Sequence, residues 1–230
     1  MIKAFVFDIG DCIEPSTNIK ISSLRWLKKK NQLPNKFVKT YIELDKYHEP
    51  HMFHAQGEPK IMRMTLKKLK SKANAKVLSR LMNKAYWKIL KSYYLKDNKG
   101  KEFIRAAKYL KKRNYKIGII SDNSLNAKVL YFDLWNNFGL KFNSFVVSED
   151  VGSEKPSKKP FQASISELKV NPNEAIYFGN NLKRDSIAKR YGWNFVWVYG
   201  FDKIKINKFK GIKIEFITLK SLISLLKKQG

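Results

Sequence analysis

The chain has 230 residues, of which 43% are hydrophobic, with a formal net charge of +28 and a single cysteine, Cys12. This length and composition suit one globular domain, with or without an insertion. One cysteine excludes an internal disulfide and a zinc site built of cysteines, and no apolar run reaches the roughly 18 residues that suggest a membrane span. A strand pattern begins directly after Met1-Ile2-Lys3, so we expect no signal peptide and a cytoplasmic protein.

The positive charge reflects 47 Lys and Arg residues against 19 Asp and Glu residues. A field of this sign attracts polyanions and phosphorylated substrates. The basic residues are spread along the chain, in blocks no longer than triplets such as Lys28-Lys29-Lys30 and Lys111-Lys112-Arg113. Proteins that bind nucleic acids gather such residues on one face. The pattern therefore favours solvated, lysine-rich helices, and a nucleic-acid partner is the less favoured alternative.

The predicted elements follow two different rhythms. Residues 4–7 form an apolar run typical of a buried strand. From about residue 21 to residue 96 the pattern is helical, clearest from Val77 to Tyr93, where apolar residues recur every three or four positions. Pro34 fits the first turn of a further helix that carries Phe37 and Tyr41. Beyond residue 98 helices are expected at 101–112, 130–134, 161–168, 187–190 and 219–226, and strands at 116–120, 145–147, 175–178 and 195–198.

Strands that alternate with helices indicate a parallel sheet covered on both faces. The fold class is therefore α/β, with a Rossmann-like parallel-sheet core. Because the first strand belongs to that sheet, the helical stretch is an insertion. We expect residues 1–14 and 98–230 to form the core and residues 15–97 to form an all-helical cap domain.

Each informative polar cluster follows a predicted strand. The clusters are Asp8 to Asp11, Ser121-Asp122-Asn123, Gly152 to Pro156, and Gly179 to Asp185. Because the carboxyl ends of parallel strands meet at one edge of a sheet, these groups can share a crevice. Together they offer a carboxylate nucleophile, an ammonium group, a hydroxyl with free amides, and oxygen ligands for a hard cation. Such a set suits phosphoryl transfer through an aspartyl phosphate.

At these four segments the chain resembles the haloacid dehalogenase-like hydrolase superfamily, in its phosphatase form with an inserted helical cap. Phe5 to Gly10 resembles the first motif and Ile119 to Asn123 the second. Ser148 to Pro156, with its Lys-Pro pair, resembles the third, and Tyr177 to Asp185 the fourth. The four motifs occur in the family's order over most of the chain.

The resemblance implies a phosphomonoesterase that acts on a small phosphorylated metabolite. Asp8 would attack phosphorus and form an acyl phosphate, which water then hydrolyses. Ser121, Asp122 and nearby backbone amides would hold the phosphoryl oxygens. Lys155 would balance the charge of both the nucleophile and the phosphate.

The resemblance also implies a Mg²⁺ cofactor. Its ligands would be the Asp8 carboxylate, the backbone carbonyl of Gly10, and the side chains of Asn180 and Asp185. Since the second ligand is a carbonyl, glycine at that position still supplies it.

Two residues depart from the family pattern. Phosphatases of the family usually carry a second Asp, the general acid and base, where this chain has Gly10, and loss of such a group typically costs about 10²–10⁴-fold in rate. The neighbouring Asp11 is a less favoured substitute. Asn180 stands where Asp is usual, which keeps an oxygen ligand but removes one negative charge.

These departures leave alternatives open: a slow or specialised phosphatase, a catalytically impaired binding protein, or a 2-haloacid dehalogenase-type hydrolase. Dehalogenases of the family need no metal, but they carry an aromatic residue at the position of Gly10. We therefore favour the phosphatase. The sequence does not identify the substrate or the oligomeric state.

Three further features have less specific explanations. His48, His51 and His54 lie close together, but Pro50 and Gly57 interrupt any helix there, so a polar cap loop is favoured over a metal site. The alternating aromatic residues at 193, 195, 197, 199 and 201 are expected to pack in the core rather than to stack on bases. Cys12 is expected to be a small buried side chain.

Overall fold

The computed structural model describes residues 1–47, 59–201 and 209–227. The three clustered histidines lie outside these ranges, so their predicted loop stays a prediction. Within the same ranges, no helix combines the length and apolarity needed to cross a bilayer.

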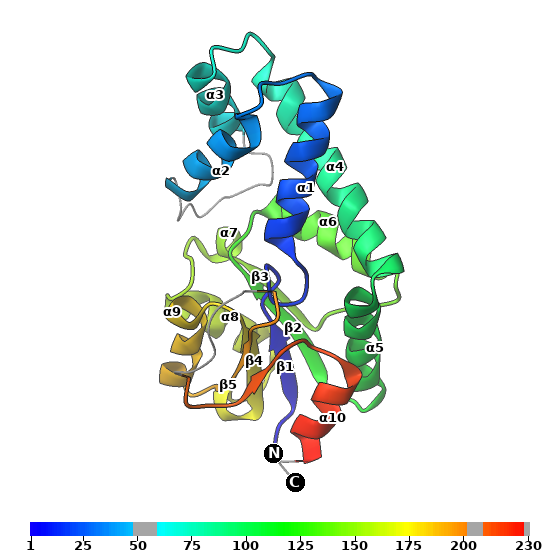
Figure 1. The fold of residues 1–230 in the computed structure, drawn as a ribbon. Helices are drawn as coiled ribbons and strands as arrows, with labels where there is room; N and C mark the ends of the chain where they lie inside the picture. Colours follow the sequence, from blue (N-terminus) through cyan, green and yellow to red (C-terminus); the bar gives the residue numbers. More distant parts are fainter. Residues whose placement is uncertain (48–58, 202–208, 228–230) are drawn as a thin grey trace.

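The core of the fold is a six-stranded sheet in which every neighbouring pair is parallel, in the order β3-β2-β1-β4-β5-β6. This confirms the predicted α/β class. The first strand, β1, lies in the middle between β2 and β4, and all three point toward the helices that follow β1 in the chain (Figure 1). The strands are β1 (Ala4–Phe7), β2 (Lys116–Ser121), β3 (Ser144–Val147), β4 (Ala175–Gly179), β5 (Asn194–Val198) and β6 (Lys213–Ile214).

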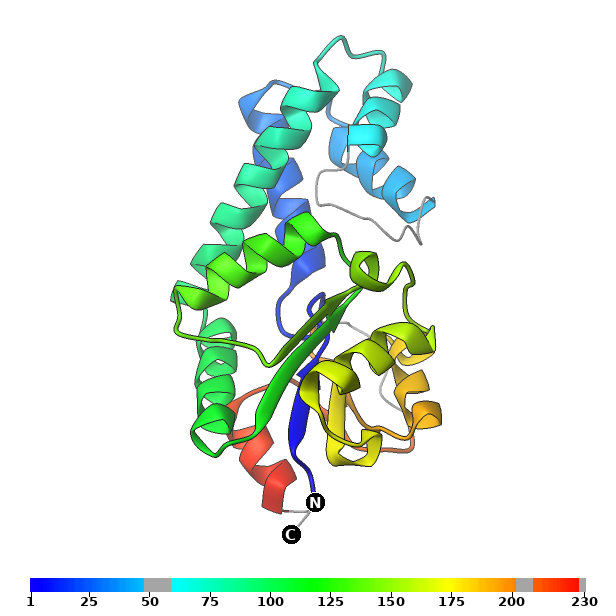
Figure 2. The same ribbon diagram turned by 180° about the vertical axis from the view of Figure 1, so that it is seen from behind.

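Helices cover both faces of the sheet, because the side chains of β1 point alternately to one face and the other and are apolar on both. Phe5 and Phe7 point into one hydrophobic cluster, and Ala4 and Val6 point into the other. The two layers of helices lie on opposite sides of the sheet (Figures 1 and 2). The first layer holds α5 (Asn98–Lys112), α6 (Leu125–Asn136) and α10 (Leu219–Lys227), and the second holds α8 (Lys158–Leu168) and the 3₁₀ helix η2 (Ser186–Tyr191).

In the described part of the stretch between β1 and α5, four helices share a separate hydrophobic cluster, which includes Leu24, Phe37 and Met82. They rise from the carboxyl edge of the sheet, and α1 and α4 run side by side (Figures 1 and 2). The first begins at Ser16, earlier than the helical pattern suggested. Their bounds are α1 (Ser16–Lys30), α2 (Phe37–Tyr47), α3 (Pro59–Lys68) and α4 (Ala75–Lys96).

Pro34 does not lie in the first turn of α2, as predicted, but before it. Phe37 is the first residue of the helix, and its N–H donates to the Pro34 carbonyl over 2.9 Å. Proline here begins the turn that leads into the helix. A single Asp97 separates α4 from α5, and its carboxylate caps α5 by accepting from the Lys99 N–H.

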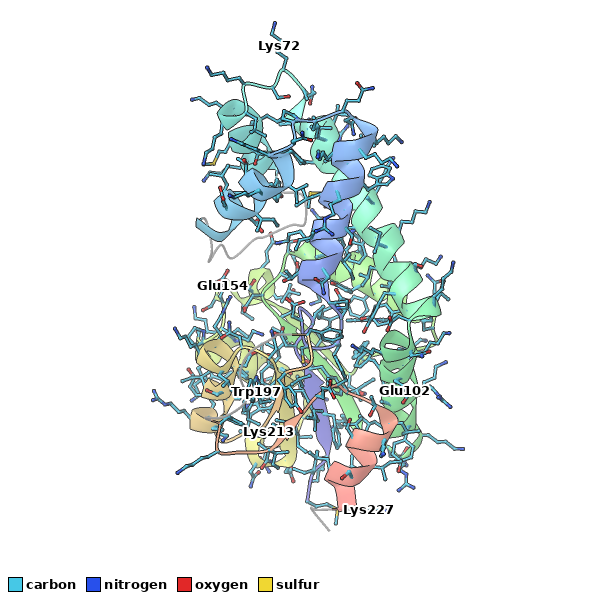
Figure 3. All side chains as sticks on the ribbon, in the orientation of Figure 1. Lys72, Glu102, Glu154, Trp197, Lys213 and Lys227 are labelled. Atoms are coloured by element: carbon cyan, nitrogen blue, oxygen red, sulfur yellow. The ribbon has the colours of Figure 1, made fainter. Side chains whose placement is uncertain are left out.

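Other expectations about packing are confirmed. Trp193, Phe195 and Trp197 are buried in the second cluster rather than displayed for stacking. Cys12 is buried as well. Lysine side chains project from both ends of the molecule, from Lys72 at the tip of the helices to Lys227 at the far end of the sheet (Figure 3).

Candidate active site

Asp8 lies directly after the central strand, at the edge of the sheet that faces α1 (Figure 1). Its N–H donates to the Phe178 carbonyl over 2.8 Å, so the ladder between β1 and β4 holds its backbone. Its side chain accepts from the Ile9 N–H at Oδ1, over 2.9 Å. The strand pairing thus fixes the carboxylate at the sheet edge with little freedom to turn away.

Lys155 reaches this carboxylate from the loop between α7 (Ser148–Val151) and α8. Its Nζ lies 2.9 Å from Asp8 Oδ1 and 3.0 Å from Asp185 Oδ1, with Asp122 Oδ2 farther away at 3.9 Å. The ammonium also donates to the Tyr177 hydroxyl over 2.8 Å. Only 2% of the lysine side chain is exposed, so its charge depends on these carboxylates for compensation.

The electrostatics of the pair follow from that burial. Burial raises the pKa of Asp8 to about 7; Lys155 opposes this shift, and the nearby Asp185 and Asp122 add to it. For Lys155, burial alone lowers the pKa, but Asp185 and Asp8 outweigh it and the pKa of the ammonium rises. The cluster holds more negative than positive charge in a poorly hydrated place.

The Asp122 carboxylate contacts protein groups on both of its oxygens, so it is not the part of this residue that would hold a phosphate. One oxygen accepts from the Lys155 N–H over 2.9 Å, and the other pairs with Arg184 Nη2 over 2.7 Å. Arg184 also pairs with Glu154 and donates from Nε to the Lys155 carbonyl. This frame fixes the loop that carries the catalytic candidate Lys155.

Asp185 approaches the strand edge closely because residue 179 is glycine. A Cβ at Gly179 would lie 2.5 Å from Asp185 Oδ2, closer than real side chains pack. That oxygen accepts from the Asn181 N–H over 2.8 Å. The turn after β4 therefore holds the carboxylate in one orientation, with its other oxygen toward Lys155.

A cavity of about 250 Å³ opens above Asp8. It is lined by all the residues that the sequence analysis selected: Asp8, Gly10, Ser121, Asp122, Lys155, Asn180 and Asp185. The helices contribute the opposite wall through Ser16, Thr17 and Lys20 of α1 and Tyr131 of α6. The cavity therefore lies between the sheet edge and the start of α1.

Asp11 lines the same cavity, but its carboxylate holds the start of α1. It accepts from the Thr17 N–H over 3.2 Å and from the Thr17 hydroxyl over 2.5 Å. Its backbone has φ +53°, a left-handed conformation that asparagine and aspartate tolerate better than most residues. These contacts explain its position as a helix cap beside the site.

Another buried carboxylate, Glu14, lies two residues before the start of α1. Its Oε1 accepts from the hydroxyls of Tyr131 over 2.6 Å, Ser16 over 3.0 Å and Tyr86 over 3.2 Å. Its Oε2 accepts from the Tyr94 hydroxyl over 2.9 Å. Burial raises the pKa of Glu14 to about 7, although the hydroxyl donors oppose this.

Arg184, Tyr177 and the Glu14 cluster are parts of this region that the sequence pattern does not single out. A tyrosine inside an apolar strand signals a hydroxyl that needs a partner. A lone acid between Ile13 and Pro15 signals the same need. Neither pattern tells which distant residue supplies the partner.

Fold and site together define an α/β protein with a parallel sheet and a buried carboxylate–ammonium pair at the end of its central strand. The family model of the haloacid dehalogenase-like hydrolases matches residues 43–198. The chain therefore belongs to this family. The matched stretch contains Ser121, Lys155 and Asp185 and begins after Asp8.

Individual relatives and structures agree with this assignment. A glyceraldehyde 3-phosphate phosphatase from Methanopyrus kandleri is 24% identical over 195 residues, which cover 80% of this chain and 78% of the relative. One of the same name from Pyrococcus furiosus is 32% identical over 46% of this chain and 42% of its own. Magnesium-bound YfnB from Bacillus subtilis has a TM-score of 0.69 at 18% identity, with 98% of each chain covered, which shows the shared fold.

Proposed function

We propose that this protein is a phosphomonoesterase that hydrolyses a small phosphorylated metabolite through an aspartyl phosphate on Asp8. The ion pair of Asp8 and Lys155 at the carboxyl edge of the sheet carries this proposal, since both face a small polar cavity. The names of the two curated relatives support the substrate class. We also place the protein in the cytoplasm, on the sequence pattern alone.

The reaction proceeds in two displacements. In the first, Asp8 Oδ2 attacks phosphorus, because the contacts to Lys155 and Ile9 engage Oδ1. The P–O bond to the alcohol breaks, and the alcohol leaves with a proton from solvent water. In the second, water attacks phosphorus and the P–O bond to Asp8 breaks, which leaves inorganic phosphate and the free carboxylate while one proton returns to solvent.

Other residues hold the phosphoryl group. Lys155 offsets the negative charge that the phosphate brings to Asp8. Ser121, at the end of β2, offers its hydroxyl to a phosphoryl oxygen. Asp122 serves through its backbone amide, while its carboxylate keeps Lys155 and Arg184 in place.

A Mg²⁺ ion fits the donors at this edge. Asp8, the Gly10 carbonyl, Asn180 and Asp185 all offer oxygen and all line the cavity. Among the described residues no three His, Cys, Asp or Glu side chains group as metal ligands by themselves, so the set depends on the carbonyl and the amide. When bound, the ion neutralises phosphoryl charge and relieves the excess of carboxylates around Lys155.

The four helices α1 to α4 act as the cap, residues 15–97, over a core of residues 1–14 and 98–230. Their separate hydrophobic cluster supports this division. Lys20 places a cation on the cap side of the cavity, where it pairs with Asp45 over 2.7 Å. The cap thus surrounds the part of the substrate that is not transferred.

A screen of phosphorylated metabolites and 4-nitrophenyl phosphate, with phosphate release measured with and without Mg²⁺, tests the function. We expect turnover with Mg²⁺, its loss in EDTA and its return with added metal. Asp8→Asn should lower turnover by at least about 10³-fold and leave the thermal unfolding transition in place.

Other results would favour the alternatives. No turnover of 4-nitrophenyl phosphate with any divalent metal would favour a binding protein. Chloride release from 2-chloropropionate without metal would favour a dehalogenase. Inhibition by oligonucleotides that salt abolishes would indicate a nucleic-acid substrate.

A further inference from the structure

The glycine at position 10 leaves a space with one polar neighbour. Among the described residues, a Cβ built on Gly10 would meet only Ser16 within 4 Å, with the hydroxyl Oγ at 3.6 Å and the Cβ at 3.8 Å. Both residues line the cavity above Asp8. Ser16 is therefore the side chain toward which a residue at position 10 would point.

The Ser16 hydroxyl belongs to a network that holds it at this place. Its oxygen lies 3.0 Å from Glu14 Oε1 and 3.3 Å from the Tyr86 hydroxyl. Glu14 also accepts from Tyr131, whose side chain lines the same cavity. The network thus joins the sheet edge, the first turn of α1, and helices α4 and α6 around a single carboxylate.

The same network lets Ser16 turn its proton toward the cavity. Tyr86 can donate to Ser16 as well as to Glu14, since its hydroxyl lies 3.3 Å and 3.2 Å from them. When Tyr86 donates to Ser16, the serine proton is released for another acceptor. Glu14 remains satisfied, because Tyr131 and Tyr94 still donate to its two oxygens.

We propose that Ser16 is a catalytic residue that donates a hydrogen bond to the leaving-group oxygen, in the space that Gly10 leaves, and that Glu14 positions its hydroxyl. This role rests on the phosphatase function proposed above. It concerns a hydrogen bond to the oxygen as its bond to phosphorus breaks, when negative charge gathers there. The proton that the alcohol finally keeps still comes from solvent.

If Ser16 has this role, the effect of its hydroxyl on the rate depends on how basic the leaving oxygen is. An alkyl alcohol leaves as a strongly basic oxygen and gains much from a donor, whereas 4-nitrophenolate is a weak base and gains little. The test therefore compares kcat/KM for two substrates, because this constant reports the steps up to departure of the first product. The substrates are 4-nitrophenyl phosphate and glyceraldehyde 3-phosphate, or the alkyl phosphate hydrolysed fastest in the screen.

Ser16→Ala should lower kcat/KM for the alkyl phosphate at least tenfold more than for the aryl phosphate. Ser16→Thr keeps a hydroxyl at the same place and should keep the wild-type ratio of the two constants. Tyr94→Phe removes a different donor from the same carboxylate, away from the cavity, and should also keep that ratio. Equal losses on both substrates in Ser16→Ala would overturn the leaving-group contact and leave the phosphatase function in place.

A second variant tests the space itself. Gly10→Asp in the Ser16→Ala background supplies a new polar group from the opposite side, and it should raise the ratio of alkyl to aryl kcat/KM again. A ratio that stays at the Ser16→Ala value would contradict the proposed position of the leaving group. Absence of turnover by the unchanged protein on both substrates would overturn the phosphatase function, and the contact with it.

Discussion

Asp8 and Glu14, six residues apart, both have a pKa raised to about 7, but the first has charged neighbours and the second has neutral ones. For both, burial is the largest cause of the shift. Asp8 is opposed by a buried ammonium and reinforced by two other carboxylates. For Glu14, the contacts that oppose the rise in pKa all come from neutral hydroxyl groups.

The difference separates a chemical site from a structural one. Around Asp8, charges of both signs lie within a few ångströms, so binding of an anion or a cation changes the balance strongly. Around Glu14 the contacts are four neutral hydroxyl donors, from Ser16, Tyr86, Tyr94 and Tyr131, so among the described residues no second charge is at hand. The proposed function uses the first region for charge compensation, whereas the second joins α1, α4 and α6 through hydroxyl contacts to one carboxylate.

Removal of the ammonium should have the largest effect on stability. Lys155→Met leaves Asp8, Asp185 and Asp122 without their shared cation, and breaking such a buried pair costs about 3–5 kcal/mol. Urea unfolding at pH 8 measures this loss. The gap to the unchanged protein should narrow toward pH 5, as the carboxyl groups take up protons. A gap of the same size at pH 8 and pH 5 would show that lost packing, rather than charge, explains the effect.

The Glu14 cluster should respond to the opposite kind of change. Its folded pKa of about 7 exceeds the usual 4.5 of the unfolded chain, so the protonated form favours folding. The contribution is complete below about pH 4.5 and is lost as the pH rises through 7. Glu14→Gln removes the cost of ionisation and should gain up to about 3 kcal/mol over the unchanged protein above pH 7.

The measurement is the free energy of unfolding of both proteins between pH 4.5 and pH 8. Their difference should shift in favour of Glu14→Gln across this window. A difference that does not vary with pH would mean that Glu14 is ionised in both the folded and unfolded protein. The different stabilities of Glu14→Gln and Lys155→Met would then reflect packing and not the charge state of Glu14.

The same contrast explains what the sequence predicts well. Asp8 and Lys155 belong to clusters that follow predicted strands, and parallel pairing alone brings strand ends together. The alternation of strands with helices along the chain predicts helices on both faces, as the two clusters show. The order of strands along the chain is therefore enough to predict residues that the sheet itself brings together.

The Glu14 cluster needs information that local pattern does not contain. Tyr86, Tyr94 and Tyr131 lie on apolar helix faces, and a tyrosine in that pattern is predicted to be a core residue. Their hydroxyls meet Glu14 only through the angle at which α4 and α6 pack beside α1. Arg184 is similar: its partners Asp122 and Glu154 come from two other loops. Side-chain partners across three elements depend on tertiary packing, which motif spacing does not encode.

A smaller effect should come from the strand edge at Gly179. In Gly179→Ala the new Cβ meets Asp185 at 2.5–2.6 Å, so that carboxylate must move and weaken its 3.0 Å contact with Lys155. Overpacking of this kind costs about 1–3 kcal/mol. We expect turnover in the metabolite screen to fall at least about tenfold, because the contact between Asp185 and Lys155 weakens. Full turnover in this variant would show that Asp185 is not held as tightly as its contacts indicate.

The smallest effect should come from one hydroxyl of the Glu14 cluster, and its pH dependence sharpens the comparison further. Tyr94→Phe removes the donor at Glu14 Oε2 and should cost about 1 kcal/mol in the free energy of unfolding. A hydrogen bond to an ionised carboxylate is roughly twice as strong as one between neutral groups. The cost at pH 8 should therefore be about twice that at pH 5. An equal cost at both pH values would mean that Glu14 keeps one charge state throughout, and its likeness to Asp8 would not hold.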